Sequence, residues 1–194
     1  MNQHAGEMSK MNTLMNKYLE EKRIKVVFNK QMIEEYTESY FKHYPNRRKQ
    51  PLEFLGKKRL GQLPSWNRVI NCPNRIVQNQ WKQELSDYTS YIINKLGIND
   101  ANIDKCIVVA KQYQSTKAKS DSDNIYLKSS LDALVKGGVL VEDNYTVLNP
   151  CILSTFHDKQ NPRTEIIIYP LDGIFTTDVI LNMIFEDLKE ELKK

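Results

Sequence analysis

Cysteine and histidine are scarce in this 194-residue chain, which has three of each. Cys72, Cys106 and Cys151 lie far apart and form no Cys-x-x-Cys pair. The three histidines add no zinc-ligand spacing to them, which argues against a zinc site. The cysteines are instead typical of reduced, buried thiols in an intracellular protein.

Long apolar runs are also absent. No stretch approaches the length needed to span a bilayer, and the N-terminus has no apolar signal-peptide core. We therefore expect no membrane association and a cytoplasmic location. The length fits one domain with a full-sized core, so we expect a polar N-terminal extension over 1–22 and a single domain over 23–194.

Charge is not balanced along the chain. There are 28 Lys and Arg residues against 24 Asp and Glu, for a net charge of +4. The window 45–76 holds eight basic residues and one acid, Glu53. Its Pro- and Gly-punctuated part around 45–62 is interpreted as a basic insertion. A concentrated positive field suits a polyanionic partner, and a solvated basic loop is the alternative.

The hydrophobic pattern predicts an α+β fold with a mixed β-sheet backed by helices. Short β-branched runs indicate strands, and apolar residues three and four apart indicate helices. The expected strands are 24–28, 104–114, 145–156 and 164–169. The expected helices are 31–44, 74–96, one that follows Asp123 and ends at Gly137, and 177–194.

One segment of the basic window combines a rigid turn, an aromatic ring and polar side chains. Pro64 and Ser65 are followed by Trp66, Asn67 and Arg68. Such a group can place a ring against a sugar or base and a guanidinium against phosphate, so the last three are predicted to bind nucleic acid. The alternative is that Trp66 fills the edge of the core beneath the loop.

Three carboxylates form a candidate metal site. Asp121 and Asp123 are two residues apart, so in an extended chain both side chains point to the same side. Asp143 can return from a later turn. Carboxylates held close together repel unless a cation lies between them, and a hard ion such as magnesium prefers oxygen ligands. Each aspartate also has an ordinary interpretation, with Asp123 capping a helix, Asp143 in a turn and Asp121 in solvent.

Basic residues accompany these carboxylates. Lys111 lies in the strand before them, and Lys117 and Lys119 directly precede Asp121, so all three are predicted to bind nucleic acid. Lys128 could neutralise a phosphate oxygen or a leaving group, or simply pair with Asp132 one helical turn away. From the residues alone, the hypothesis is metal-dependent hydrolysis of phosphodiesters.

An ordered series of these residues resembles the RusA family of Holliday junction resolvases. The resemblance covers about 63–171, and its motifs are Pro64–Asn67, Asp121–Asn124, Lys128, Leu131–Leu134, Gly137–Asp143 and Asn161–Ile166. Three residues separate Asn124 from Lys128, one more than in the family pattern.

The resemblance implies a RusA-like fold and a homodimeric, Mg²⁺-dependent endonuclease that resolves four-way DNA junctions by paired symmetric nicks in recombination or repair. It also implies that Asp121, Asp123 and Asp143 bind the metal and that Lys128 is the catalytic lysine. Two other functions stay open: a different structure-specific metal-dependent nuclease, and a DNA-binding protein without catalysis.

Overall fold

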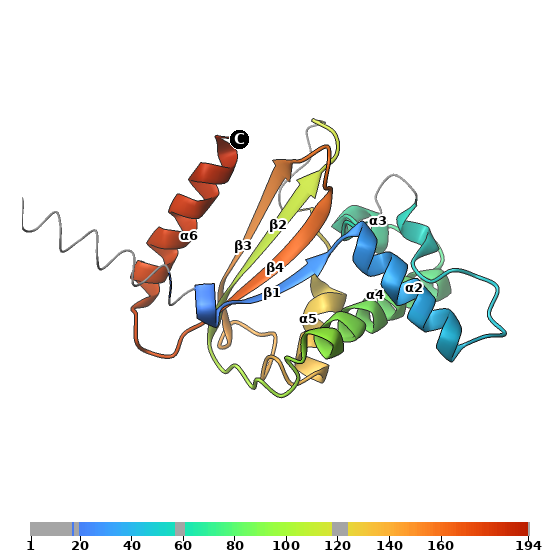
Figure 1. The fold of residues 1–194 in the computed structure, drawn as a ribbon, viewed down its shortest axis with the longest axis horizontal. Coiled ribbons are helices and arrows are strands. Elements are labelled where there is room, and N and C mark those ends of the chain that lie inside the picture. The colour runs from blue at the N-terminus through green and yellow to red at the C-terminus, as the bar shows by residue number, and fades with distance from the viewer. Residues whose placement is uncertain (1–16, 18–19, 57–60, 118–123, 194) are drawn as a thin grey trace, which may run out of the picture.

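A four-stranded mixed sheet is the centre of the computed structural model, which describes residues 17, 20–56, 61–117 and 124–193 (Figure 1). Its strands are β1 (Ile24–Phe28), β2 (Cys106–Gln114), β3 (Leu148–His157) and β4 (Arg163–Pro170). Their order across the sheet is β1-β4-β2-β3. β2 pairs in parallel with β3 and antiparallel with β4, and β4 pairs antiparallel with β1. The predicted mixed α+β architecture is confirmed.

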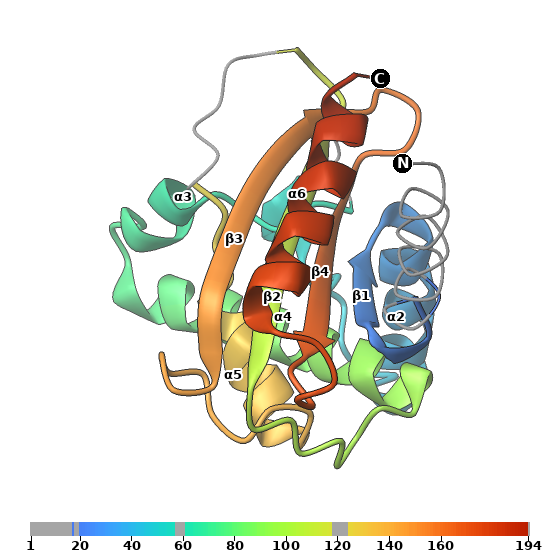
Figure 2. The same cartoon turned by 90° about the vertical axis from the view of Figure 1, so that its left-hand side faces the viewer.

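Helices cover both faces of the sheet. The described part contains α2 (Lys30–His43), α3 (Trp66–Ile70), α4 (Arg75–Leu96), α5 (Lys128–Lys136) and α6 (Thr177–Leu192). Figure 2 shows α6 crossing one face, with α4 and α5 behind the sheet. No helix among the described residues is long and apolar enough to cross a membrane.

The long helix α4 ends where its sequence predicts. The Asn74 side chain accepts hydrogen bonds from the first-turn amides of Ile76 and Val77. Gly97 follows the last turn with a φ of 64°, a left-handed conformation that glycine adopts without a Cβ clash. Leu85 and Ile92 on its apolar stripe are buried.

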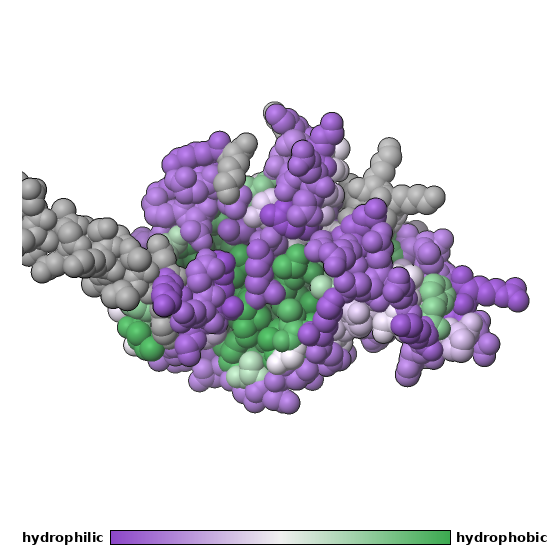
Figure 3. All heavy atoms as spheres, viewed as in Figure 1, coloured by the Kyte–Doolittle hydropathy of each residue, from purple (hydrophilic) through white to green (hydrophobic). Residues whose placement is uncertain are grey.

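The central strand β2 separates two hydrophobic cores. Cys106, Val108 and Ala110 pack into the core beneath α2, α4 and α5, whereas Ile107 and Val109 pack into the core beneath α6. This follows from the two-residue alternation of a strand that is buried on both faces. On the face seen in Figure 3, apolar side chains gather near the middle of the view and hydrophilic residues surround them.

Two predicted elements begin later than expected. The helix expected after Asp123 is α5, which begins at Lys128 with Leu127 at its N-cap position and no capping side chain. The three residues before it, 125–127, bury their side chains instead. The N-cap position of this helix is therefore Leu127, and Asp123, for which capping was the ordinary interpretation, lies outside the described residues. β3 begins at Leu148 because 144–147 form a turn.

The prediction of buried thiols is only partly correct. Cys106 is buried in β2, but Cys72 is half-buried and Cys151 is exposed. Cys151 lies on β3, an edge strand of the sheet, where the residue is exposed although burial still raises the pKa of its thiol.

The basic insertion is anchored rather than loose. Leu52, which precedes the short 3-10 helix over 53–55, and Leu55, which ends it, are buried. Glu84 of α4 accepts a hydrogen bond from the Leu52 amide at 2.8 Å. The Phe54 ring stacks on Trp81 of α4, with 4.8 Å between centroids. Arg47, Arg48 and Lys49 remain exposed on this support.

Candidate functional site

A short segment, 61–66, connects the candidate site to the sheet. Thr164 of β4 donates its amide to the Gly61 carbonyl at 3.0 Å and accepts the Leu63 amide at its hydroxyl. On the β2 side, the Gln62 amide group donates to the Tyr113 carbonyl, and Gln112 donates to the Leu63 carbonyl. These bonds fix the segment across the ends of two neighbouring strands.

The same segment holds the chain that returns after the predicted aspartates. Tyr126 donates its amide to the Pro64 carbonyl at 2.9 Å, and Trp66 donates its amide to the Asn124 carbonyl at 3.0 Å. The Asn124 side chain also accepts the Asn67 amide at 3.1 Å. The structure therefore brings the predicted nucleic-acid-binding group at 66–68 directly beside residue 124, which follows Asp121 and Asp123 in the chain.

Trp66 is exposed beside this junction of segments. Its side chain is 45% exposed, so it does not fill the core edge. The buried Tyr126 ring supports it from one side, with 5.4 Å between ring centroids. Asn67 and Arg68 are exposed next to it, and Arg68 donates to the Phe54 carbonyl of the basic insertion.

Lys128 opens α5 and is shared by two carboxylates. Its ammonium donates to Asp132 at 2.8 Å and to Asp143 at 2.5 Å. Hydrogen bonds to these two carboxylates raise the pKa of Lys128, so it is fully charged at neutral pH. The structure thus contains the Lys128–Asp132 pair given above as the ordinary alternative, and it also brings Lys128 to Asp143.

A compact turn carries Asp143 to this position. Asn144 accepts the Thr146 amide at its side chain and the Leu148 amide at its carbonyl, which closes the turn into β3. Tyr145 projects from the same turn with 82% of its side chain exposed. The expected strand over 145–156 included Tyr145, although Asp143 and Asn144 directly before it are residues typical of turns.

Two of the three predicted metal ligands, Asp121 and Asp123, lie outside the described residues, as does Lys119. Within the described ranges no group of three His, Cys, Asp or Glu side chains converges to hold a metal. Asp132 and Asp143 do meet at one cation, the Lys128 ammonium. Carboxylate oxygens are the ligands that Mg²⁺ prefers, and Asp143 is the one predicted metal ligand among the described residues.

Lys111 is placed apart from this cluster, on the other face of the sheet. Lys117 is exposed at the end of the described chain before residue 124. Lys111 is buried on the α6 face of the sheet and lines a charged cavity of about 280 Å³ with Glu165 and Asp187. Burial lowers the pKa of Lys111. The structure does not bring Lys111 to Lys128 or to Trp66.

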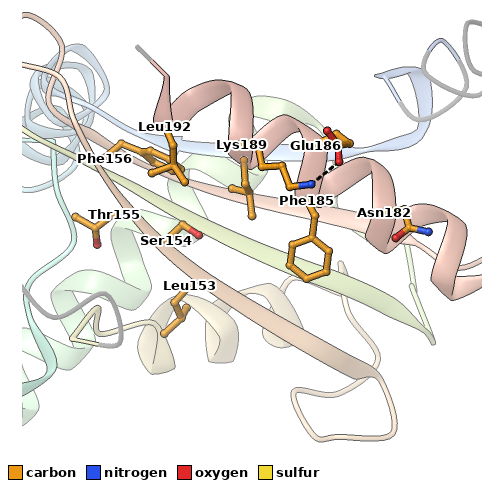
Figure 4. A pocket seen from close by; sticks show the side chains of 10 residues that line it. Leu153, Ser154, Thr155, Phe156, Asn182, Phe185, Glu186, Lys189 and Leu192 are labelled. Carbon is orange, nitrogen blue, oxygen red and sulfur yellow. Dashed lines mark hydrogen bonds and ion pairs between the residues drawn. The ribbon is translucent and has the colours of Figure 1, made fainter.

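A groove of about 610 Å³ lies between β3 and α6 (Figure 4). Its only charged lining residues, Glu186 and Lys189, are exposed and pair with each other. Phe185 and Leu192 supply much of its apolar surface. This groove contains no cluster of groups suited to catalysis.

Comparison with models of known protein families finds no match to this chain, and a search of curated proteins finds no significantly similar sequence.

Proposed function

We propose that this chain is a magnesium-dependent endonuclease that resolves four-way DNA junctions by paired symmetric nicks, acting as a homodimer. The observation that carries the proposal is the meeting of Lys128 and Asp143 at 2.5 Å, one short segment away from the exposed 66–68 group. The ordered motifs that resemble the RusA family support the same activity. A two-fold dimer suits a substrate in which two equivalent strands are cut.

Each residue then has a distinct role. Asp143, with Asp121 and Asp123, would hold Mg²⁺, which when bound activates water and stabilises negative charge on the phosphate. The Lys128 ammonium, kept charged by Asp132, lies beside Asp143 and neutralises a phosphate oxygen or the leaving group. Arg68 and Lys117 are exposed and bind the DNA backbone.

The test is cleavage of a synthetic four-way junction with Mg²⁺ or with EDTA, alongside a duplex and a flap of matched sequence. We expect symmetric nicks in the junction only, and only with Mg²⁺. Asp143→Asn and Asp123→Asn are expected to abolish cleavage and retain junction binding. Asp178→Asn, an exposed position at the start of α6, is the control and should cut normally.

Each alternative gives a different result. Equal cutting of flaps and junctions would show that the activity is general structure-specific cleavage and not junction resolution. Junction binding without cleavage under any metal would favour a non-catalytic DNA-binding protein. Unchanged cleavage by Asp143→Asn would refute the assigned site.

A further inference from the structure

Helix α3 presents two large apolar side chains to solvent beside the proposed active site. Trp66 begins this helix and Ile70 ends it, four residues later, so both lie on one side. They are 45% and 41% exposed. Neighbouring exposed apolar groups beside polar residues are typical of a contact surface.

The Trp66 ring is held in place before any partner arrives. The Tyr126 ring lies against the Trp66 ring, and the Trp66 backbone amide donates a hydrogen bond to the Asn124 carbonyl. The Ser65 hydroxyl accepts the Arg68 amide at 3.3 Å and so caps the helix. A ring fixed in this way loses little conformational entropy when a flat partner stacks on it.

The charged residues near Trp66 and Ile70 in the sequence indicate which kind of partner this surface binds. The chain from 61 to 83 contains Arg68, Arg75 and Lys82 and no Asp or Glu. Gln78 of α4 donates to the Val69 and Ile70 carbonyls, so α3 and the basic start of α4 are fixed together. An exposed aromatic ring in a basic segment matches the aromatic stacking groups and basic grooves of proteins that bind single-stranded nucleic acid.

We infer that Trp66 and Ile70 form a stacking platform for unpaired DNA bases, with Arg68 and Arg75 binding the adjoining phosphates. This rests on the proposed function and deepens it, because it names the part of the substrate that this surface recognises. Bases inside an intact duplex are stacked on each other, so the platform distinguishes opened DNA from duplex.

Intrinsic fluorescence tests the platform directly, because the chain contains two tryptophans. Trp81→Phe removes the other one and preserves a ring against Phe54. With EDTA present, so that no cleavage occurs, this variant is titrated with oligothymidylate and with duplex of equal length. Trp66 emission is expected to fall at least two-fold with oligothymidylate and to change little with duplex.

Affinity measurements supply a second readout. Trp66→Leu is expected to weaken oligothymidylate binding about ten-fold, the lower range for losing one stacked base. Trp66→Phe should restore most of the affinity, and Ile70→Ala should give a smaller loss. Duplex binding should change less than two-fold in each variant. Phe185→Leu, a similarly exposed aromatic on α6, is the control and should leave both affinities unchanged.

The outcomes separate this inference from the nuclease proposal. Normal junction cleavage without quenching of Trp66 would overturn the platform alone. Equal quenching by duplex and single strand would overturn it too. Selective quenching by oligothymidylate in a chain that never cuts a junction would support the platform and overturn the nuclease. A chain that binds no DNA at all would overturn both.

Discussion

Lys128 forms ion pairs with two carboxylates that belong to different parts of the fold. Asp132 is one turn along the same helix, whereas Asp143 belongs to a separate turn. An exposed pair within one helix contributes little stability. The contact to Asp143 matters more, because it fixes the turn that supplies a proposed metal ligand.

Replacing Lys128 tests whether its charge serves chemistry. Lys128→Met is expected to reduce junction cleavage at least a hundred-fold, the usual loss when one electrostatic stabiliser of a transition state is removed. Junction binding should fall less than three-fold. The measurement is single-turnover cleavage at saturating enzyme, with Lys136→Met at the exposed end of α5 as control. Equal effects of the two variants would contradict the assignment.

Glu165 is the residue for which pH dependence is expected. Burial alone would raise its pKa, but hydrogen bonds from Arg163 and Lys25 outweigh burial and leave the pKa lowered. A carboxyl with a lowered folded-state pKa stabilises the fold above its unfolded pKa, and this stabilisation is lost as pH falls through the folded value.

Glu165→Gln is therefore expected to destabilise the protein by about 2 kcal/mol at pH 7, because the exposed Lys25 and the half-buried Arg163 lose a charged hydrogen-bond acceptor. The free energy of unfolding from urea denaturation should differ from wild type by a constant amount above about pH 5. That difference should shrink below pH 4.5, the ordinary pKa of the group. A difference independent of pH would show that the charge is not the cause.

Elements that follow local rules were predictable from the sequence, and those built by distant contacts were not. The ends of α4 follow from Asn74 and Gly97, which act on neighbouring amides and carbonyls. Residues 125–127 look helical in sequence, yet the Tyr126 amide bonds to Pro64, 62 residues earlier in the chain. The functional roles of 66–68 and Lys128 stay predictions, and the sequence could not place Lys111 on the opposite face of the sheet from α5.

Gly61 tests the segment that supports the site. Its φ is 95°, and an added Cβ would lie 2.8 Å from the Lys30 amide nitrogen and from the Pro162 carbonyl oxygen. Gly61→Ala is expected to cost about 3 kcal/mol, combining the left-handed strain with overpacking against backbone. Gly173→Ala has a similar φ of 80° but open space around it, so about 1 kcal/mol is expected.

Thermal unfolding of the two glycine variants separates the causes. A larger loss in Gly61→Ala measures the steric clash, since both variants share the backbone strain. Equal losses would show that the segment can move away from β4 and α2.

At the scale of the whole molecule, the exposed residues of the basic insertion decide the size of the DNA footprint. Arg47, Arg48 and Lys49 are exposed and precede the 3-10 helix over 53–55, whose Phe54 ring stacks on Trp81 of α4. If all three contact phosphate, replacing them with Gln should reduce the slope of log affinity against log salt by about 3. The combined substitutions Lys105→Gln, Lys189→Gln and Lys193→Gln remove the same three charges at exposed positions outside the insertion and are the control for net charge. An unchanged slope would make the insertion a surface subdomain without DNA contact.

Segment 61–66 has a consequence for the chain between Tyr113 and Tyr126. The Gln62 side chain donates a hydrogen bond to the Tyr113 carbonyl, and the Pro64 carbonyl accepts one from the Tyr126 amide. A change in the number of residues between these two positions would leave both ends held by the same segment and shift Asp121 and Asp123 along the chain relative to Lys128. Such length changes are expected to impair junction cleavage while the sheet and its helices keep their arrangement.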